Sequence, residues 1–358
     1  MAENGNPPGV MIVGYGDMGK IHYKNLLPLQ EEGKVKISSV VDRDYSKVEG
    51  LGPIGYESVQ QALEETKPDI ALVVVNTDTH AEVIGELIEY AGKEKSPAIY
   101  CETPFAESLS EALPLAEKLT ALGYGSEIPL GFAYLIRYSP ATDALISYIN
   151  DKNLPVESVD IAWRKLRKPA RPSAGVHIDE TTHSADTALQ YILPMTGNRV
   201  KGVALEKIRQ VYTDSIIDKE KQTELYGKGS EKMVPMAEVE YTLKCLTEGG
   251  KLIPLHGFSS YMNPDFVRRI SVSCENGETL TTYYDKAGKD ELTVRREGKA
   301  GEEMLGSWNM STPGKNRVRM ELEDFLDYYK TGKRSPRIAG LDSALFDLQV
   351  TGLLESSP

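Results

Sequence analysis

A glycine motif close to the start of the chain constrains the fold more than any other feature. The apolar residues 10–13 run directly into Gly14-Tyr15-Gly16-Asp17-Met18-Gly19, with the spacing G-x-G-x-x-G. This pattern predicts a buried strand that turns tightly into a helix: Gly14 permits the turn, Gly16 lets the backbone approach a pyrophosphate, and Gly19 lets helix and strand pack closely. The first turn of such a helix presents N–H groups without intrahelical partners, which favours phosphate binding there.

An acidic residue follows the motif at the distance that a dinucleotide site requires. Residues 35–41 predict a second strand, and Asp42 stands directly after it, 23 residues beyond Gly19. A carboxylate about 20 residues after the glycines binds the adenosine ribose. Asp42 can accept two hydrogen bonds from the ribose of NAD and would repel the 2′-phosphate of NADP, whereas Arg43 can pair with that phosphate. We therefore expect NAD as the cofactor, and Arg43 leaves NADP open.

Charge and composition argue against several classes of protein. The net charge of −12 disfavours nucleic-acid binding, which needs clustered positive charge. No apolar run approaches the ~20 residues of a membrane span, and the first residues lack a signal peptide's basic and apolar regions. The three cysteines have neither metal-ligand spacing nor an even count, so we expect reduced thiols, no metal site and a cytoplasmic location.

The pattern of apolar residues changes along the chain and predicts two domains. Strand-like runs at 69–75, 97–101 and 128–135 alternate with helical patterns at 58–65, 79–90 and 110–122, as in a parallel sheet covered on both faces. From about residue 156, longer strands alternate apolar and polar residues, as in an antiparallel sheet with one covered face. We expect an α/β chain: a doubly wound Rossmann domain over residues 1–132 and an α+β domain with a large, mostly antiparallel open sheet over residues 133–358.

With these features in place, the chain resembles the Gfo/Idh/MocA oxidoreductases. The resemblance rests on the glycine motif with His22 three residues on and on five further motifs in the family's order: residues 77–80 (Thr-Asp-Thr-His), 101–106 (Cys-Glu-Thr-Pro-Phe-Ala), Gly131-Phe132 with Arg137 and Pro140, 179–183 (Asp-Glu-Thr-Thr-His) with Asp186, and 340–345 (Gly-Leu-Asp-Ser-Ala-Leu). It implies hydride transfer between NAD(P) and a hydroxyl-bearing carbon of a sugar, cyclitol or related polyol. The residues expected to bind the cofactor are Gly14, Gly16, Asp17, Met18, Gly19, Asp42, Arg43, Asn76, Thr77, His80, Glu102, Thr103 and Pro104.

The resemblance also implies an oligomer. In that family the open sheet of the second domain commonly forms the subunit interface. One uncovered apolar face between about residues 156 and 292 would expose a patch too large for a monomer. We therefore expect a homodimer or homotetramer.

One position departs from the family pattern. The family motif after the fourth strand is Glu-Lys-Pro, and its lysine polarises the carbonyl and relays the proton. In this chain Thr103 occupies that place, and a threonine hydroxyl is neither cationic nor a useful acid at neutral pH. Three interpretations follow: another group has taken over the role, the substrate is a cationic imine that needs no lysine, or the protein binds a dinucleotide without catalysis.

Asp179 and His183 are the remaining acid–base candidates. On a helix, positions i and i+4 share one face, so a carboxylate could orient the imidazole and shift its pKa toward neutrality. The resemblance implies that both face the substrate hydroxyl, with His183 as general acid or base and Asp179 as its orienting group or a substrate ligand. The alternative is a helix N-terminus capped by Asp179 or Thr181, with His183 half-buried.

Residues 163–172 are the most basic stretch of this acidic chain. They form either a solvated loop or the mouth of a site for an anionic substrate. Lys165 is a candidate to replace the missing lysine. The catalytic residues that we expect are His183, Asp179 and Lys165, and the substrate-binding residues are Thr103, Tyr134, Arg137, Arg164, Asp179 and His183.

Overall fold

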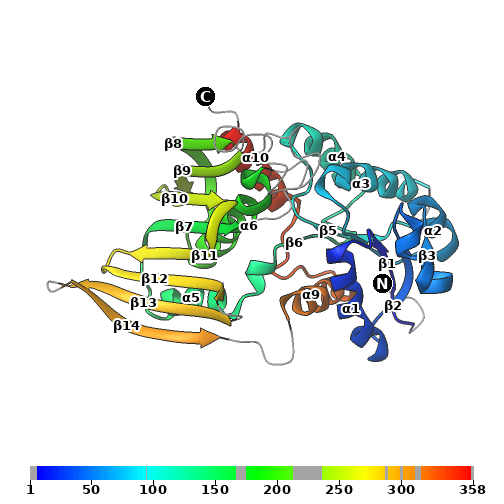
Figure 1. Ribbon diagram of the computed structural model, residues 1–358, viewed down its shortest axis with the longest axis horizontal. Helices are drawn as coiled ribbons and strands as arrows, with labels where there is room; N and C mark the ends of the chain where they lie inside the picture. The colour runs from blue at the N-terminus through cyan, green and yellow to red at the C-terminus, as the bar shows by residue number, and fades with distance from the viewer. Residues whose placement is uncertain are drawn as a thin grey trace. The chain divides into compact units, whose positions relative to one another are not determined.

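The computed structural model describes residues 6–93, 95–166, 175–212, 236–286, 289–298, 301–310 and 316–355. The chain divides into two units: unit 1 comprises residues 1–135 and 315–348, and unit 2 comprises residues 136–314 and 349–358 (Figure 1). None of the helices in the described part of the chain is both long and apolar enough to cross a membrane.

Unit 1 is built on a parallel sheet of six strands. The strands are β1 (Gly9–Val13), β2 (Lys36–Val41), β3 (Gly55–Tyr56), β4 (Ile70–Val73), β5 (Ala98–Glu102) and β6 (Leu130–Ala133). Their order in the sheet is β3-β2-β1-β4-β5-β6, and every pairing is parallel. The order reverses between β1 and β4, which is where doubly wound folds bind their ligands. The expected Rossmann domain is confirmed.

Helices connect these strands and cover the sheet. They are α1 (Asp17–Glu31), α2 (Val59–Thr66), α3 (Thr77–Ala91) and α4 (Leu109–Ala121). Ser58 caps α2 and Ser108 caps α4, each accepting a backbone N–H bond in the first turn. All four residues of β4 are buried, as expected for a strand with helices on both sides.

The compact units of the structure differ from the expected domains, 1–132 and 133–358, chiefly in the C-terminal part of the chain. Residues 315–348 belong to unit 1, where helix α9 (Arg317–Thr331) packs Leu322 and Phe325 into the core beside Tyr100. The Phe132 N–H donates to the carbonyl of Ala339 at 3.0 Å. These contacts join segments two hundred residues apart, and local sequence patterns do not encode them. Helix α10 (Leu341–Glu355) begins in unit 1 and ends in unit 2.

Unit 2 is built on a sheet of eight strands. The strands are β7 (Val156–Leu166), β8 (Val200–Tyr212), β9 (Met236–Thr247), β10 (Leu252–Ser260), β11 (Met262–Cys274), β12 (Glu278–Lys286), β13 (Lys289–Gly298) and β14 (Gly301–Met310). The order is β14-β13-β12-β11-β7-β10-β9-β8, and β7 with β10 is the single parallel pairing among these strands. The expectation of a mostly antiparallel sheet is confirmed.

Helical segments pack against this sheet. Helix α5 (Pro140–Asp151) contacts β12 and β13. A second helical stretch begins with a π-helical turn (His177–Thr181) and continues through α6 (Thr182–Asp186), a second π-helical segment (Thr187–Ile192) and α7 (Leu193–Met195).

The exposed side of the β7, β10 and β9 strands carries polar as well as apolar residues, so it is less apolar than the uncovered face that we expected. In half-exposed His256, Nδ1 lies 3.4 Å from Oδ2 of Asp160 and Nε2 lies 3.3 Å from Oε1 of Glu240. The strand register places Asp160 beside His256. The alternation of apolar and polar residues correctly predicted polar side chains on one side of these strands. Half-exposed polar side chains do not need to be covered by a second subunit.

Candidate functional site

The glycine turn after β1 has the geometry that the motif predicts. Gly14 has a φ of +102°, and a Cβ there would lie 2.6 Å from the carbonyl oxygen of Val74. A Cβ on Gly19 would collide with the carbonyl oxygen of Gly14. Both glycines are therefore required by the protein's own packing.

Gly16 is different, because nothing in the described chain requires a glycine there. Its φ is −72°, and a Cβ built on it meets no heavy atom of the described residues within 4 Å. Gly16 is also the N-cap of α1, and because it has no side chain it cannot cap the N–H groups of the first turn of that helix. A bound phosphate explains both features, since it needs close backbone approach and unpaired N–H groups. The site thus fits the pyrophosphate of a dinucleotide.

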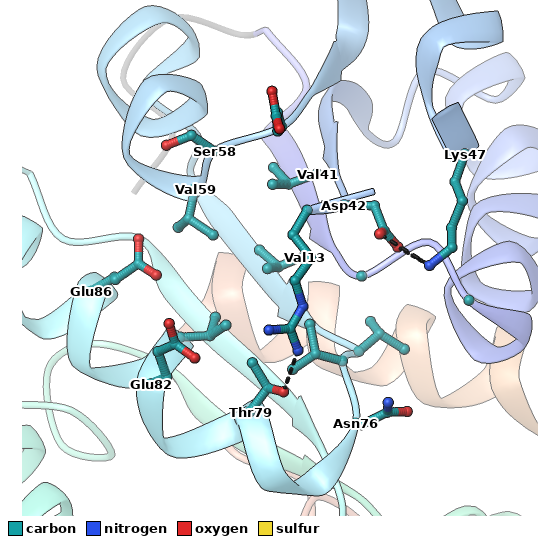
Figure 2. A pocket seen from close by; sticks show the side chains of 17 residues that line it. Val13, Val41, Asp42, Lys47, Ser58, Val59, Asn76, Thr79, Glu82 and Glu86 are labelled. Atoms are coloured by element: carbon teal, nitrogen blue, oxygen red, sulfur yellow. Dashed lines mark hydrogen bonds and ion pairs between the residues drawn. The ribbon is translucent and has the colours of Figure 1, made fainter. Parts of the chain in front are cut away.

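A pocket of about 360 Å³ lies at the carboxyl ends of β1, β2 and β4. Figure 2 shows that α3 contributes Thr79, Glu82 and Glu86 to one side of it. Its lining residues are Val13, Gly14, Gly16, Val41, Asp42, Arg43, Lys47, Glu57, Ser58, Val59, Val74, Val75, Asn76, Thr79, Glu82, Val83 and Glu86. The glycine turn and the predicted ribose-binding acid therefore line the same pocket.

Asp42 is held ionised in this pocket. The N–H of Tyr15 donates to Oδ2 at 2.9 Å, and the N–H of Asp44 donates to Oδ1 at 2.9 Å. Lys47 Nζ donates to Oδ1 at 3.1 Å (dashed line in Figure 2). Burial raises the pKa of Asp42, but these hydrogen bonds and the Lys47 charge outweigh it and lower the pKa below its ordinary value.

Lys47 and the acidic side of the pocket are features that our sequence reasoning missed. Lys47 is the last residue of a short 3-10 turn (Tyr45–Lys47). In the sequence, only its position five residues after Asp42 could have indicated that the two side chains meet. Burial raises the pKa of Glu86, and the charges of Glu82 and Glu89 raise it further. The guanidinium of Arg43 donates to Thr79 Oγ1 at 3.0 Å, so this cation is tied to α3.

The other residues expected to bind the cofactor differ in their burial and their contacts. Asp17 and Asn76 are exposed, and Met18 and Thr77 are half-buried, at the starts of α1 and α3. His80 is buried, with Nδ1 2.7 Å from the carbonyl oxygen of Pro104 and Nε2 3.1 Å from that of Val75. His80 therefore contacts both backbone segments rather than presenting its ring to the pocket.

The altered motif after β5 is tied to the main chain. Thr103 Oγ1 donates to the carbonyl of Ala133 at 3.1 Å, so its proton is committed there. Glu102 Oε1 lies 2.6 Å from Nε2 of the buried His22. Neither contact supplies the positive charge that the family's lysine would carry at this position.

A second carboxyl group in unit 1 is deeply buried. Glu321 on α9 is fully buried, and burial raises its pKa well above the usual range. The charge of Glu102 raises this pKa further, whereas hydrogen bonding to Tyr100 and Tyr134 acts in the opposite direction. Tyr134, an expected substrate residue, is itself buried.

In unit 2, the Asp179–His183 element is the helical stretch that begins at the π-helical turn. His183 is half-buried on α6, and the side chain of Asp179 lies outside the described residues. Lys165 Nζ donates to Oε1 of Glu180, and Arg268 Nη2 lies 3.5 Å from Oε2 of the same carboxylate. Burial raises the pKa of Glu180, but Lys165, Arg268 and His183 lower it below its ordinary value.

Arg137 and Arg164 differ in accessibility. Arg137 is 2% exposed, and its guanidinium makes a two-pronged ion pair with the buried Asp186, with Nε 2.7 Å from Oδ2. Arg164 is half-buried on β7. Residues 167–172 of the basic stretch lie outside the described residues. Within the described ranges, no group of three His, Cys, Asp or Glu side chains could hold a metal ion.

The comparisons with known proteins agree with this fold. Residues 9–124 match the model of an oxidoreductase family with an NAD-binding Rossmann fold, Gfo/Idh/MocA. The expected resemblance to that family is confirmed. A comparison with curated proteins finds no match.

Several solved structures share the fold over nearly the whole chain. One is UDP-N-acetylglucosamine 3-dehydrogenase GnnA from Acidithiobacillus ferrooxidans, with 15% identity, a TM-score of 0.68, and 97% of this chain and 96% of that chain covered. Another is KijD10, a 3-ketoreductase from Actinomadura kijaniata in complex with TDP-benzene and NADP, with 13% identity, a TM-score of 0.70 and 98% of each chain covered. A third is a super-repressor mutant of Gal80p from Saccharomyces cerevisiae, with 15% identity, a TM-score of 0.70, and 98% of this chain and 95% of that chain covered. At these identities the likeness shows the fold alone.

Proposed function

From the match of residues 9–124 to the Gfo/Idh/MocA oxidoreductase family model, we propose that the protein transfers a hydride between NAD(P)(H) and a carbon of a sugar derivative that carries a hydroxyl or keto group. The observation that carries the proposal is the pocket of unit 1, where the glycine turn, the N-terminus of α1 and the ionised Asp42 meet. Reduced or oxidised nicotinamide supplies the hydride chemistry when bound there.

We propose NAD(H) as the preferred cofactor. The carboxylate of Asp42 would repel a 2′-phosphate, and Glu57, Glu82 and Glu86 add acidic groups to the same pocket. Lys47 neutralises part of this charge, and Arg43 is engaged with Thr79. The acidic groups outnumber the two cations, which supports NAD(H) over NADP(H).

We assign the proton transfer to unit 2. His183 would act as general acid or base, with Asp179 orienting it or binding substrate. Lys165 would supply the positive charge that Thr103 lacks, because an ammonium stabilises a developing alkoxide. Its ion pair with Glu180 supports a charged Lys165.

The substrate is proposed to carry an anionic group. Arg164, Lys165 and Arg268 are half-buried cations in unit 2, and guanidinium groups bind phosphate and carboxylate well. Two proteins of this fold are a UDP-N-acetylglucosamine 3-dehydrogenase and a 3-ketoreductase in complex with TDP-benzene and NADP. We therefore place nucleotide sugars first among the substrates to test.

A spectrophotometric panel tests the proposal. The purified protein is incubated with NAD(H) or NADP(H) and, separately, UDP- and TDP-sugars, simple sugars, cyclitols and imines, and the near-UV absorbance of reduced cofactor is followed. Turnover of a nucleotide sugar or polyol is the expected result. Turnover of imines alone would show that the protein is an imine reductase, which is the alternative activity that Thr103 leaves open.

A noncatalytic dinucleotide-binding role is the second candidate. It is favoured by Thr103 in place of the family's lysine and by the presence of a super-repressor mutant among proteins of this fold. Tight cofactor binding without turnover of any panel member would support it.

We further propose a homodimer or homotetramer joined through the unit 2 sheet, and a cytoplasmic location. The three cysteines, Cys101, Cys245 and Cys274, are all buried free thiols, which supports a reducing compartment.

A further inference from the structure

Glu180 is a buried acid that contacts two of the cations of unit 2. Its side chain is 3% exposed, whereas Lys165 is 21% exposed and Arg268 is 23% exposed. Lys165 Nζ donates to one carboxylate oxygen, and Arg268 lies beside the other. The carboxylate therefore sits behind two cations that solvent can reach.

Two partly exposed cations contact this one buried carboxylate. A buried carboxylate persists only when it is paired, and Glu180 has two cationic partners for one negative charge. Arg268 has a second carboxylate, Asp285, at 3.4 Å, but that group is largely exposed and its charge is screened by water.

The geometry around Glu180 is fixed by its neighbours. The Thr181 hydroxyl donates to Ser259 Oγ at 2.9 Å and so anchors the π-helical turn to β10. The Arg268 guanidinium lies 5.5 Å from the ring centre of Trp163 and 5.1 Å from that of Phe266, which limits its movement.

Glu180 also acts on His183. The two residues are three positions apart on one helical stretch, and the imidazolium charge of His183 contributes to the pKa of Glu180. Coulombic coupling between two groups is reciprocal, so we expect removal of the Glu180 charge to act on His183 as well.

We propose that Glu180 is a positioning residue for the proton-transfer groups: it pairs with the Lys165 ammonium and lies three positions before His183 on one helical stretch. This inference rests on the proposed function, because it assigns those two residues a proton-transfer role. It also predicts properties of the protein that need no substrate.

Nuclear magnetic resonance tests the inference directly. Lys165 is followed by reductive ¹³C-methylation, with its signal assigned by loss in Lys165→Arg, and the His183 ring is followed by its carbon-bound protons, assigned by loss in His183→Gln. In Glu180→Gln we expect both groups to titrate at lower pH than in the unaltered protein, because a compensating negative charge is lost. Glu180→Asp retains the charge and should restore the His183 titration.

Glu278→Gln is the matched control, since Glu278 is also a buried glutamate of unit 2 paired with an arginine, Arg296. It should leave both titrations unchanged. Identical titrations in Glu180→Gln and the unaltered protein would overturn the inference and leave Glu180 a folding role only. Should Glu180→Gln fail to fold, Lys165→Gln tests the same contact: His183 should then titrate at higher pH, and an unchanged or lower value would overturn the inference.

Kinetics separate this inference from the proposed function. With any substrate found in the panel, Glu180→Gln should lower kcat by about 10²-fold through misplacement of the reacting groups, with an unchanged KM for reduced cofactor. If the unaltered protein turns over no substrate, the proposed function fails while the titrations still decide the role of Glu180.

Discussion

Asp42 shows how a single side chain can set cofactor choice. Its charge is stabilised by two backbone N–H groups that the turns after β1 and β2 supply, and by Lys47. Only the carboxylate and its position after a strand could be predicted from the sequence. The N–H donors and the lysine depend on how the two turns meet, which no local pattern encodes.

The first prediction concerns Asp42. Asp42→Ala should bring the affinities for NADPH and NADH close together, because the main electrostatic barrier to the 2′-phosphate is removed. Fluorescence titration of both reduced cofactors measures this. Equal or tighter NADPH binding by the unaltered protein would refute the preference and direct attention to Arg43 and Lys47.

The second prediction concerns Glu321, whose pKa burial raises. Below the ordinary glutamate pKa the group is neutral in both folded and unfolded protein, so folding carries no ionisation cost. As the pH rises toward the folded-state pKa, the unfolded chain loses a proton that the folded chain keeps, and stability falls by about 1.4 kcal/mol per pH unit. Glu321→Gln should therefore be the more stable protein at pH 8, with little difference near pH 4.

Denaturant unfolding at several pH values measures this difference. Asp327→Asn, an exposed position on the same helix, is the control and should show no pH-dependent gain. A variant that is no more stable than the unaltered protein at pH 8 would mean that Glu321 is not held protonated.

The third prediction concerns the proton relay. His183→Ala should lower kcat by about 10² to 10⁴-fold with little change in NADH affinity. Thr103→Lys should fold and leave KM unchanged for a hydroxyl or keto substrate. A cationic imine would instead be repelled by the new ammonium, and KM would rise sharply. Full activity of His183→Ala would rule out the catalytic assignment.

At the scale of elements, the glycine turn and the strands could be predicted from the sequence. The packing of α9 on the core of unit 1 could not. The G-x-G-x-x-G spacing and the buried strands follow local rules of backbone sterics and burial. An amphipathic pattern over α9 indicates that this helix packs on a core, but not on which core. Likewise, Thr103 in the altered motif predicted that the lysine's positive charge is missing. The contacts of Glu180 with Lys165 and Arg268 could not be predicted, because the three residues lie on three separate elements.

The fourth prediction compares two glycines of one turn. Gly16→Ala should fold with unchanged thermal stability, because the new methyl group lies within 4 Å of no described atom. The variant should bind NADH at least about 10-fold more weakly, because the methyl group blocks close approach of the pyrophosphate. Gly19→Ala should lose stability, since its methyl group collides with Gly14. Thermal unfolding and cofactor titration on both variants check this. Unchanged NADH affinity in Gly16→Ala would place the pyrophosphate elsewhere.

At the scale of the whole molecule, the unit 2 sheet offers two kinds of surface. The β7, β10 and β9 strands present the polar row Asp160, His256 and Glu240, in which both carboxylates lie within 3.4 Å of the imidazole. The strand β14 at one edge of the sheet exposes Met304 and Trp308. A polar face can join subunits through ion pairs, but such pairs are screened by salt.

The fifth prediction is an oligomer that weakens with salt. Light scattering at micromolar concentration and low salt should give at least twice the chain mass of 39.5 kDa, and about 1 M salt should lower the mass if the charged face joins the subunits. Trp308→Ser should leave the assembly intact. Loss of assembly in that variant would move the interface to β14, and a mass of one chain in low salt would exclude the oligomer.

The return of residues 315–348 to unit 1 has a consequence for biosynthesis. The Rossmann strands leave the ribosome first, but α9, which packs against Tyr100, is made only after residues 136–314. At typical elongation rates this gap lasts on the order of ten to thirty seconds, during which the apolar surface that Leu322 and Phe325 will cover stays open. The nascent first domain thus exposes this apolar surface until translation is nearly finished, although the residues that line its cofactor pocket are all made early.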